Sequence, residues 1–225
     1  MRLISLLVFV IFSFGYAKDF VIIDKPIDFS QNRVSMTKDY IKNHYGLNVH
    51  DITIDPKIIV LHWTAVPTLE ASFERLKPEL LLTDRKDIAK AGAVNVSSHF
   101  LVDRDGTIYR LMPENYMGRH TIGLNYNSIG IENVGGKGDK SEDLTQAQVE
   151  ANAYLVRYLK NKYPNIEYLM GHHEYFMMKK TRYWLERDPN YFTFKNDPGD
   201  KFMADVRKRV KDLHLVAPVL TKDYR

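Results

Sequence analysis

The sequence predicts an α/β fold in which a mixed central β-sheet is flanked by helices, with a candidate metal site in a cleft at the strand ends. Short apolar runs of strand length alternate with longer segments whose apolar residues repeat at helical spacing, and this alternation is typical of α/β proteins. A chain of 225 residues with 44% hydrophobic content can bury one substantial core. Because no internal repeat or linker-like stretch interrupts the sequence, we expect one compact domain with two appendages.

Residues 1–17 are typical of an export signal peptide. Arg2 supplies a positive charge, residues 3–14 form an apolar stretch, and Gly15-Tyr16-Ala17 resembles a cleavage site. The stretch is short for a transmembrane helix, so we expect no stable membrane span, although a retained N-terminal anchor is the alternative. The sequence has no cysteine, which excludes a lipoprotein. An exported protein without disulfides suits a bacterial periplasm or the cell exterior.

The first appendage that follows is an N-terminal extension, residues 18–56. Within it, the segment from Ser30 to Tyr45, closed by Gly46, predicts one helix. We expect this helix to pack on the back surface of the domain. The domain itself is expected to cover residues 57–215, and residues 216–225 to form a C-terminal tail.

The strands of the domain are predicted by three short segments. Residues 58–61 and 168–171 are apolar runs that predict buried strands, and residues 128–132 alternate so that one face enters the core. Residues 98–112 predict a hairpin that turns at Asp105-Gly106.

Two helices are predicted after these strands by their apolar periodicity. Thr145 to Gln148 resembles a capping box, and the apolar stripe that follows it ends at Pro164. A second stripe runs from Phe202 to Leu213.

The candidate site residues follow the predicted strands. His62 comes directly after residues 58–61 and His172 directly after residues 168–171. With Asp197 they would supply the three protein ligands that a catalytic zinc usually takes. Glu132 shares a strand face with Gly130, which leaves room beside it. A histidine after an apolar strand is more often structural, however, and the spacing alone leaves a metal site undecided.

A resemblance adds to this interpretation. It rests on six short blocks, which are residues 58–64 (IIVLHWT), 96–103 (VSSHFLVD), 105–109 (DGTIY), 127–133 (NSIGIEN), 171–172 (GH) and 195–199 (KNDPG). In these blocks and their order the chain resembles the type 2 N-acetylmuramoyl-L-alanine amidases, a family that also includes the animal peptidoglycan recognition proteins. The similarity runs from about Ile58 to about Val210.

The resemblance implies a zinc enzyme that cuts the amide between N-acetylmuramic acid and L-alanine in peptidoglycan or muropeptides. By motif, His62, His172 and Asp197 match the ligands of one Zn²⁺ ion. Glu132 matches the catalytic acid/base, and Lys195 matches the residue that stabilises the transition state. The alternative is a peptidoglycan-binding module without turnover.

Three further residues are candidate substrate contacts. His120 stands where the family usually has a substrate-contacting histidine, and Arg119 replaces the tryptophan that often precedes it. Arg119 could instead pair with a stem-peptide carboxylate. Trp63, next to His62, is the third candidate. For His99 we expect a structural role, and His173 should not be a ligand because adjacent side chains in a strand face opposite ways.

Two stretches depart from the family pattern or look inserted. His172 and Asp197 lie 25 residues apart, against about ten in the family, and the aromatic-rich residues 174–194 fill the gap. Those aromatics either wall the cleft or pack the insertion onto the domain. Residues 70–93 are expected to shape the opposite rim.

The charge of the chain does not indicate a nucleic-acid partner. The pI is near 9.0 and the net charge +4, but the charged residues are interspersed rather than gathered in a stripe. We expect the protein to bind peptidoglycan or muropeptide as its substrate and not to bind nucleic acid. We also expect it to be a monomer.

Overall fold

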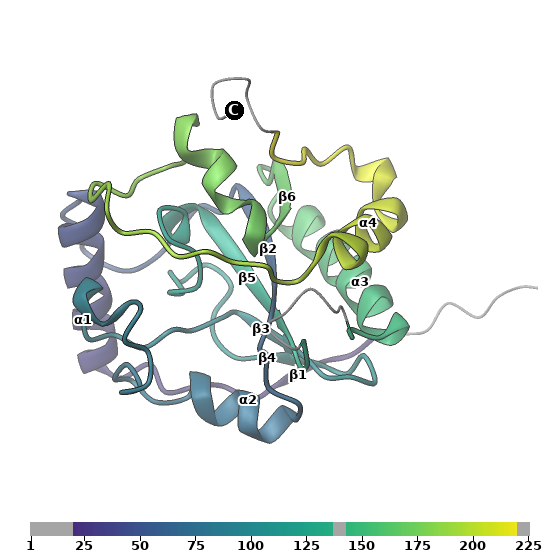
Figure 1. Ribbon diagram of the computed structural model, residues 1–225, viewed down its shortest axis with the longest axis horizontal. Helices are drawn as coiled ribbons and strands as arrows, with labels where there is room; N and C mark the ends of the chain where they lie inside the picture. The colour runs from purple at the N-terminus through teal and green to yellow at the C-terminus, as the bar shows by residue number, and fades with distance from the viewer. Residues whose placement is uncertain (1–19, 137–142, 220–225) are drawn as a thin grey trace, which may run out of the picture.

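A mixed β-sheet forms the centre of the fold (Figure 1). The computed structural model describes residues 20–136 and 143–219. Within these residues the sheet has six strands in the order β1-β4-β3-β5-β2-β6, and all neighbours are parallel except β3 and β4. The strands are β1 (Ile22–Asp24), β2 (Ile58–Trp63), β3 (Phe100–Val102), β4 (Ile108–Arg110), β5 (Ser128–Asn133) and β6 (Tyr168–Gly171). The mixed sheet and the hairpin turned at Asp105-Gly106 are confirmed.

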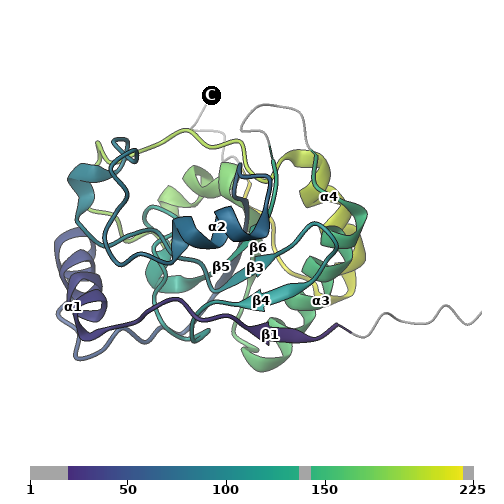
Figure 2. The ribbon, with the colours of Figure 1, turned by 90° about the horizontal axis from the view of Figure 1, so that it is seen from below.

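Helices cover both sides of this sheet, as Figures 1 and 2 show. The α-helices are α1 (Gln31–Tyr40), α2 (Leu69–Leu76), α3 (Gln146–Lys162) and α4 (Asp200–Arg209). A π-helical turn (Ile41–Tyr45) extends α1, and short 3₁₀ segments lie at Ala89–Ala91, Asn125–Asn127, His172–Lys180 and Lys211–Leu213. The predicted capping box of α3 is confirmed, because the Thr145 side chain accepts from the Gln148 N–H and the Gln148 side chain accepts from the Thr145 N–H.

The alternation of side chains along β2 separates the core from the site. Ile59 and Leu61 enter a cluster with apolar residues of α3 and α4, on one face of the sheet. Ile58 and Val60 point to the other face, where they pack against Met170 and Tyr175. Because successive residues of a strand alternate between faces, His62 lies on the second face. The apolar core therefore holds the strand that carries this histidine.

The N-terminal extension differs from its prediction in two ways. The helix from Ser30 to Gly46 is confirmed, with Ser30 as its N-cap and Gly46 in the left-handed conformation after its last turn. The extension also contributes β1, an edge strand that pairs with β4. The expected position on the back surface was wrong, because the buried Arg33 of α1 donates hydrogen bonds to main-chain carbonyls of residues 76–78, at the end of α2 and just after it.

The ends of the chain are described only in part. The predicted signal peptide lies outside the described residues, as do residues 220–225 of the predicted tail. Val216, the first residue of that tail, forms a parallel bridge with Tyr168 of β6. Among residues 20–136 and 143–219, no helix combines the length and apolarity needed to cross a membrane.

Candidate active site

Three neighbouring parallel strands bring the main site residues together. His62 of β2 is paired in register with Glu132 of β5, so both side chains leave the sheet at the same level and on the same face. Leu61 is paired with Gly171 of β6, and His172 follows one residue later. Residues predicted from separate segments thus meet at the carboxyl edge of the sheet.

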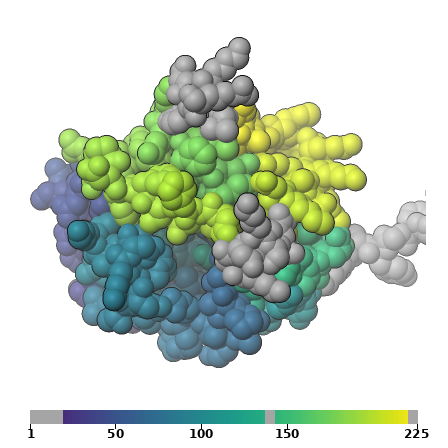
Figure 3. Space-filling view, viewed as in Figure 1, coloured from purple at the N-terminus to yellow at the C-terminus, as the bar shows by residue number. Residues whose placement is uncertain are grey.

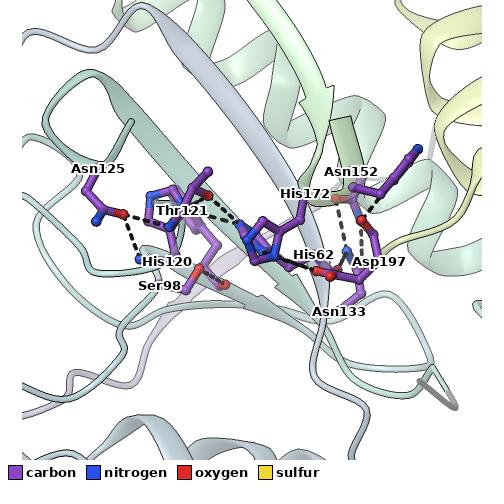
Figure 4. Close-up of polar contacts among 11 residues, drawn as sticks. His62, Ser98, His120, Thr121, Asn125, Asn133, Asn152, His172 and Asp197 are labelled. Atoms are coloured by element: carbon purple, nitrogen blue, oxygen red, sulfur yellow. Dashed lines mark hydrogen bonds and ion pairs between the residues drawn. The ribbon is translucent and has the colours of Figure 1, made fainter. Parts of the chain in front are cut away.

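His62, His172 and Asp197 form a buried triangle of potential metal ligands (Figure 4). The distances are 3.0 Å between the two histidine Nδ1 atoms, 3.1 Å from His172 Nδ1 to Asp197 Oδ2 and 3.3 Å from His62 Nδ1 to the same oxygen. In a tetrahedral site with metal–nitrogen bonds of ~2.0–2.1 Å, neighbouring ligand atoms are roughly 3.3 Å apart. Three donors at this spacing, with two imidazoles and one carboxylate, fit a zinc ion.

The ionisation of these groups also suits a metal. Burial lowers the pKa of His172 to about 4, so the imidazole is neutral near pH 7. Burial alone would raise the pKa of Asp197, but the interactions with His172 and His62 hold it well below its ordinary value. A neutral imidazole and an ionised carboxylate are the forms that coordinate a metal.

His120 contacts the other side of His62. Its Nδ1 atom lies 3.1 Å from His62 Nε2, and its main-chain N–H donates to Asn125 Oδ1 at 2.8 Å (Figure 4). Gly130 leaves the space for this ring, because a Cβ atom there would lie 2.7 Å from His120 Cγ. A hydrogen bond of this kind fixes which nitrogen of a ligand histidine faces the metal. The substrate contact predicted for His120 stays a prediction, although its ring also lines the cleft.

A second set of polar groups anchors the end of β2. Asn133 Nδ2 donates to the His62 carbonyl at 2.9 Å, and Asn152 Nδ2 of α3 donates to Asn133 Oδ1 at 2.6 Å (Figure 4). All three residues are buried. The sequence analysis missed the role of Asn152. The apolar pattern of α3 does not show that this polar residue contacts Asn133, at the end of β5 and 19 residues earlier in the chain. Asn133 is the last residue of the family block 127–133, and this position was the only sign in the sequence that it belongs near the site.

Glu132 is the second functional group of the site. Desolvation by burial is the main reason that its pKa is raised to about 7, and Asp197 adds to the effect while His62 opposes it. Among the described residues, its buried Oε2 atom has no hydrogen-bond partner. A buried carboxylate oxygen without a partner is costly, so this atom is available to a water or substrate group beside the metal triangle.

A cleft of about 380 Å³ opens over these residues and is visible as the hollow in Figure 3. Its lining includes Phe194 and Lys195 as well as Arg75 and Arg85. In Figure 3 residues 70–93 lie across the hollow from the segment that precedes Asp197, so they form the opposite rim, as predicted. Trp63 also lines the cleft, so the structure brings all the predicted metal, catalytic and substrate-contact positions to one place.

Arg119 reaches the cleft but its guanidinium is engaged elsewhere. The residue is only 3% exposed, and the guanidinium donates to the carbonyls of Ile88 at 2.9 Å and Gly92 at 3.1 Å. These contacts hold the rim segment against the domain. They favour a structural role, and the pairing with a stem-peptide carboxylate stays a prediction.

His99 and the aromatic insertion have mainly structural contacts. His99 Nε2 lies 2.8 Å from the Tyr116 carbonyl, and its Nδ1 accepts from the Gly130 N–H at 3.0 Å, so the predicted structural role is confirmed. In the insertion, the ring of the buried Tyr175 stacks on those of Trp184 and Phe192. Tyr175 also shares an apolar cluster with Ile58 and Val60 of β2, so this part of the insertion packs onto the domain. Phe194, 93% exposed, lines the cleft.

Comparisons with known proteins identify the family of the chain. Residues 53–200 match the N-acetylmuramoyl-L-alanine amidase family. The endolysin of Escherichia phage T7 is 38% identical over 86 residues, which are 37% of this chain and 56% of the endolysin, so the chain spans little more than half the length of that relative.

Two solved structures share the fold. The amidase LysC from Clostridium intestinale URNW has a TM-score of 0.50 and 24% identity, over 85% of this chain and 97% of LysC. A selenomethionine derivative of AmpD has a TM-score of 0.51 and 22% identity, over 84% of this chain and 94% of AmpD. With the family match covering more than half of its residues, the chain belongs to the N-acetylmuramoyl-L-alanine amidase family.

Proposed function

We propose that the protein is a zinc-dependent hydrolase of the amide bond between N-acetylmuramic acid and L-alanine, in peptidoglycan or in muropeptides. The observation that carries the proposal is the triangle of His62, His172 and Asp197 beside the unpartnered oxygen of Glu132. Family membership supports the same reaction. These groups are the parts that metal-assisted amide hydrolysis needs: three ligands, an acid/base and an open cleft.

The chemistry divides between the metal and the chain. When bound by His62, His172 and Asp197, zinc polarises the scissile carbonyl and lowers the pKa of a water towards ~7. Glu132, whose Oε2 has no partner among the described residues, accepts the proton of the attacking water. The same carboxyl then donates that proton to the departing alanine nitrogen, because breaking an amide requires protonation of the leaving amine.

Lys195 supplies positive charge at the mouth of the same cleft. Lys195 lines the cleft together with Glu132 and His172, and this shared lining supports a role for its ammonium beside the reacting groups. The tetrahedral intermediate of amide hydrolysis carries negative charge on the former carbonyl oxygen. An ammonium held there stabilises the transition state more than the neutral substrate.

Product analysis tests this function directly. The protein from Lys18 onward would be incubated with purified peptidoglycan and with soluble muropeptides, each with and without a zinc chelator, and the products identified by mass spectrometry. We expect free stem peptides that begin with L-alanine, only when zinc is available. Tight binding without cleavage after zinc is restored would identify a recognition module instead.

We also propose that the protein works outside the cytoplasm and as a monomer. The signal-like pattern of residues 1–17 and the absence of cysteine support export to a periplasm or the cell exterior. N-terminal sequencing of the protein from a bacterial periplasmic fraction would test the cleavage after Ala17. Light scattering would test the monomer.

A further inference from the structure

His172 and Asp197 contact each other although 24 residues separate them in the chain. Their Nδ1 and Oδ2 atoms lie 3.1 Å apart. The intervening residues leave the sheet, pack as the aromatic insertion and return to the site just before Asp197. The covalent chain between the two ligands is therefore too long to fix their distance. Another contact must hold Asp197 in place.

His173 makes that contact. Its main-chain N–H donates to the main-chain carbonyl of Asp197 at 2.9 Å. Its ring Nδ1 lies 2.9 Å from the same carbonyl oxygen, and because a carbonyl only accepts, this nitrogen carries the hydrogen. His173 is the chain neighbour of the candidate ligand His172, and its two hydrogen bonds converge on the main-chain carbonyl of Asp197.

The ring of His173 is also closely packed. A Cβ atom at Gly171 would lie 2.6 Å from His173 Cε1 and 3.0 Å from Pro198 Cδ, so the strand end leaves room for this ring only as glycine. The other ring nitrogen, Nε2, lies 3.0 Å from Asp200 Oδ1, at the first residue of α4. The ring therefore lies between the end of β6 and the segment that carries Asp197.

A neighbouring contact ties the same two segments together. Glu174 accepts from the Gly171 N–H at 2.8 Å and from Arg207 Nη1 at 3.0 Å. Arg207 lies on α4, which begins directly after Asp197-Pro198-Gly199, and also donates to the Leu169 carbonyl at 3.0 Å. Glu174 and Arg207 fix the helix relative to β6, and His173 fixes the ligand itself.

We propose that His173 is a positioning residue that holds Asp197 in the metal triangle across the insertion. The inference rests on the proposed zinc site. A ligand carboxylate that is already in place loses less freedom when the metal binds, and this raises the affinity for the metal. Partners of metal ligands typically contribute 10–100-fold in metal affinity. Loss of the ring hydrogen bond should therefore weaken zinc binding by roughly 10-fold or more.

Zinc affinity measured on four variants tests the proposal. His173→Leu and His173→Ala remove the ring donor, whereas His173→Asn keeps a donor at the position of Nδ1. His50→Leu, at an exposed histidine outside the site, is the matched control. Each chelator-stripped protein would be titrated with zinc against a chromophoric chelator, and its thermal unfolding followed without metal. Activity would be measured at limiting and at saturating zinc.

We expect His173→Leu and His173→Ala to raise the zinc Kd by roughly 10–100-fold, with activity recovered at saturating zinc. His173→Asn and His50→Leu should stay within a few-fold of the unmodified protein. The proposal is overturned if the folded Leu or Ala variant binds zinc normally and differs only in melting temperature. It is also overturned if Asn is as weak as Leu, or if neither Leu nor Ala folds. An unmodified protein that does not bind zinc would refute the proposed function instead.

Discussion

His62 and Glu132 stand opposite each other on the neighbouring parallel strands β2 and β5. One is a candidate metal ligand and the other the candidate acid/base. Adjacent strands lie roughly 4.8 Å apart, so the hydrogen bonds between β2 and β5 set the distance between the main chains of His62 and Glu132. Loops around the cleft can differ in length without changing this distance, whereas Asp197 arrives on a loop and needs contacts of its own.

Replacement of Glu132 should separate catalysis from metal binding. We expect Glu132→Gln to reduce kcat by roughly 10²–10⁴-fold, because the amide cannot take the proton from water. Zinc content should stay near that of the unmodified protein, since Glu132 is not in the ligand triangle. Steady-state kinetics with a muropeptide and metal analysis of the same samples check both expectations. A fully active variant would refute the acid/base role.

Replacement of Lys195 should affect the transition state more than the bound substrate. We expect Lys195→Met to lower kcat by roughly 10²-fold with little change in KM, because its charge acts on an oxyanion that forms only during reaction. Lys42→Met, at an exposed lysine on the turn after α1, is the matched control and should retain full activity. A rise in KM with unchanged kcat would instead assign Lys195 to substrate binding.

Removal of metal should destabilise the fold as well as abolish turnover. A ligand that binds only the folded state adds about 2.7 kcal/mol when its free concentration is 100 times Kd. Zinc added to the stripped protein should therefore raise the melting temperature by several degrees. Asp197→Ala should show a much smaller rise, because one of three ligands is lost. Equal shifts in the two proteins would mean that zinc binds elsewhere.

Glu114 predicts a pH dependence of stability that is independent of the site. This residue is 3% exposed, and its carboxylate lies 2.7 Å from Lys162 Nζ and 2.9 Å from the Tyr158 hydroxyl. Burial alone would raise its pKa, but these partners and Arg110 hold the pKa below its ordinary value. The stabilisation is therefore complete above the unfolded-state pKa of about 4.3 and is lost as the pH falls through the folded-state value.

The test compares the unmodified protein with Glu114→Gln in urea. Above about pH 5.5 the variant should be less stable by roughly 1–3 kcal/mol, since the buried carboxylate that accepts from two partly exposed cations is replaced by a neutral amide. The difference should shrink as the pH falls below about 4.3. A difference that does not change with pH would show that the carboxylate charge contributes nothing.

The sequence by itself determined most of the secondary structure elements and the candidate members of the site. Apolar runs and their periods depend on neighbours along the chain, so β2, β5, β6, α3 and α4 could be predicted from local pattern. The candidate ligands and Glu132 could be predicted because strand ends and family blocks mark them. β1 was missed, because a strand of three residues at a sheet edge has too short a pattern to distinguish it from a loop.

Tertiary structure decided what each polar side chain contacts. The sequence singled out His120, Arg119 and His173 but not their contacts. In the structure His120 contacts the His62 ring, Arg119 donates to a carbonyl of the cleft rim, and the His173 ring contacts the Asp197 carbonyl. Tertiary packing also places α1 beside the cleft rim, where Arg33 donates to a main-chain carbonyl. Hydrogen bonds between residues tens of positions apart depend on how the helices and strands pack together. The hydrophobic periodicity of a single segment does not contain that information.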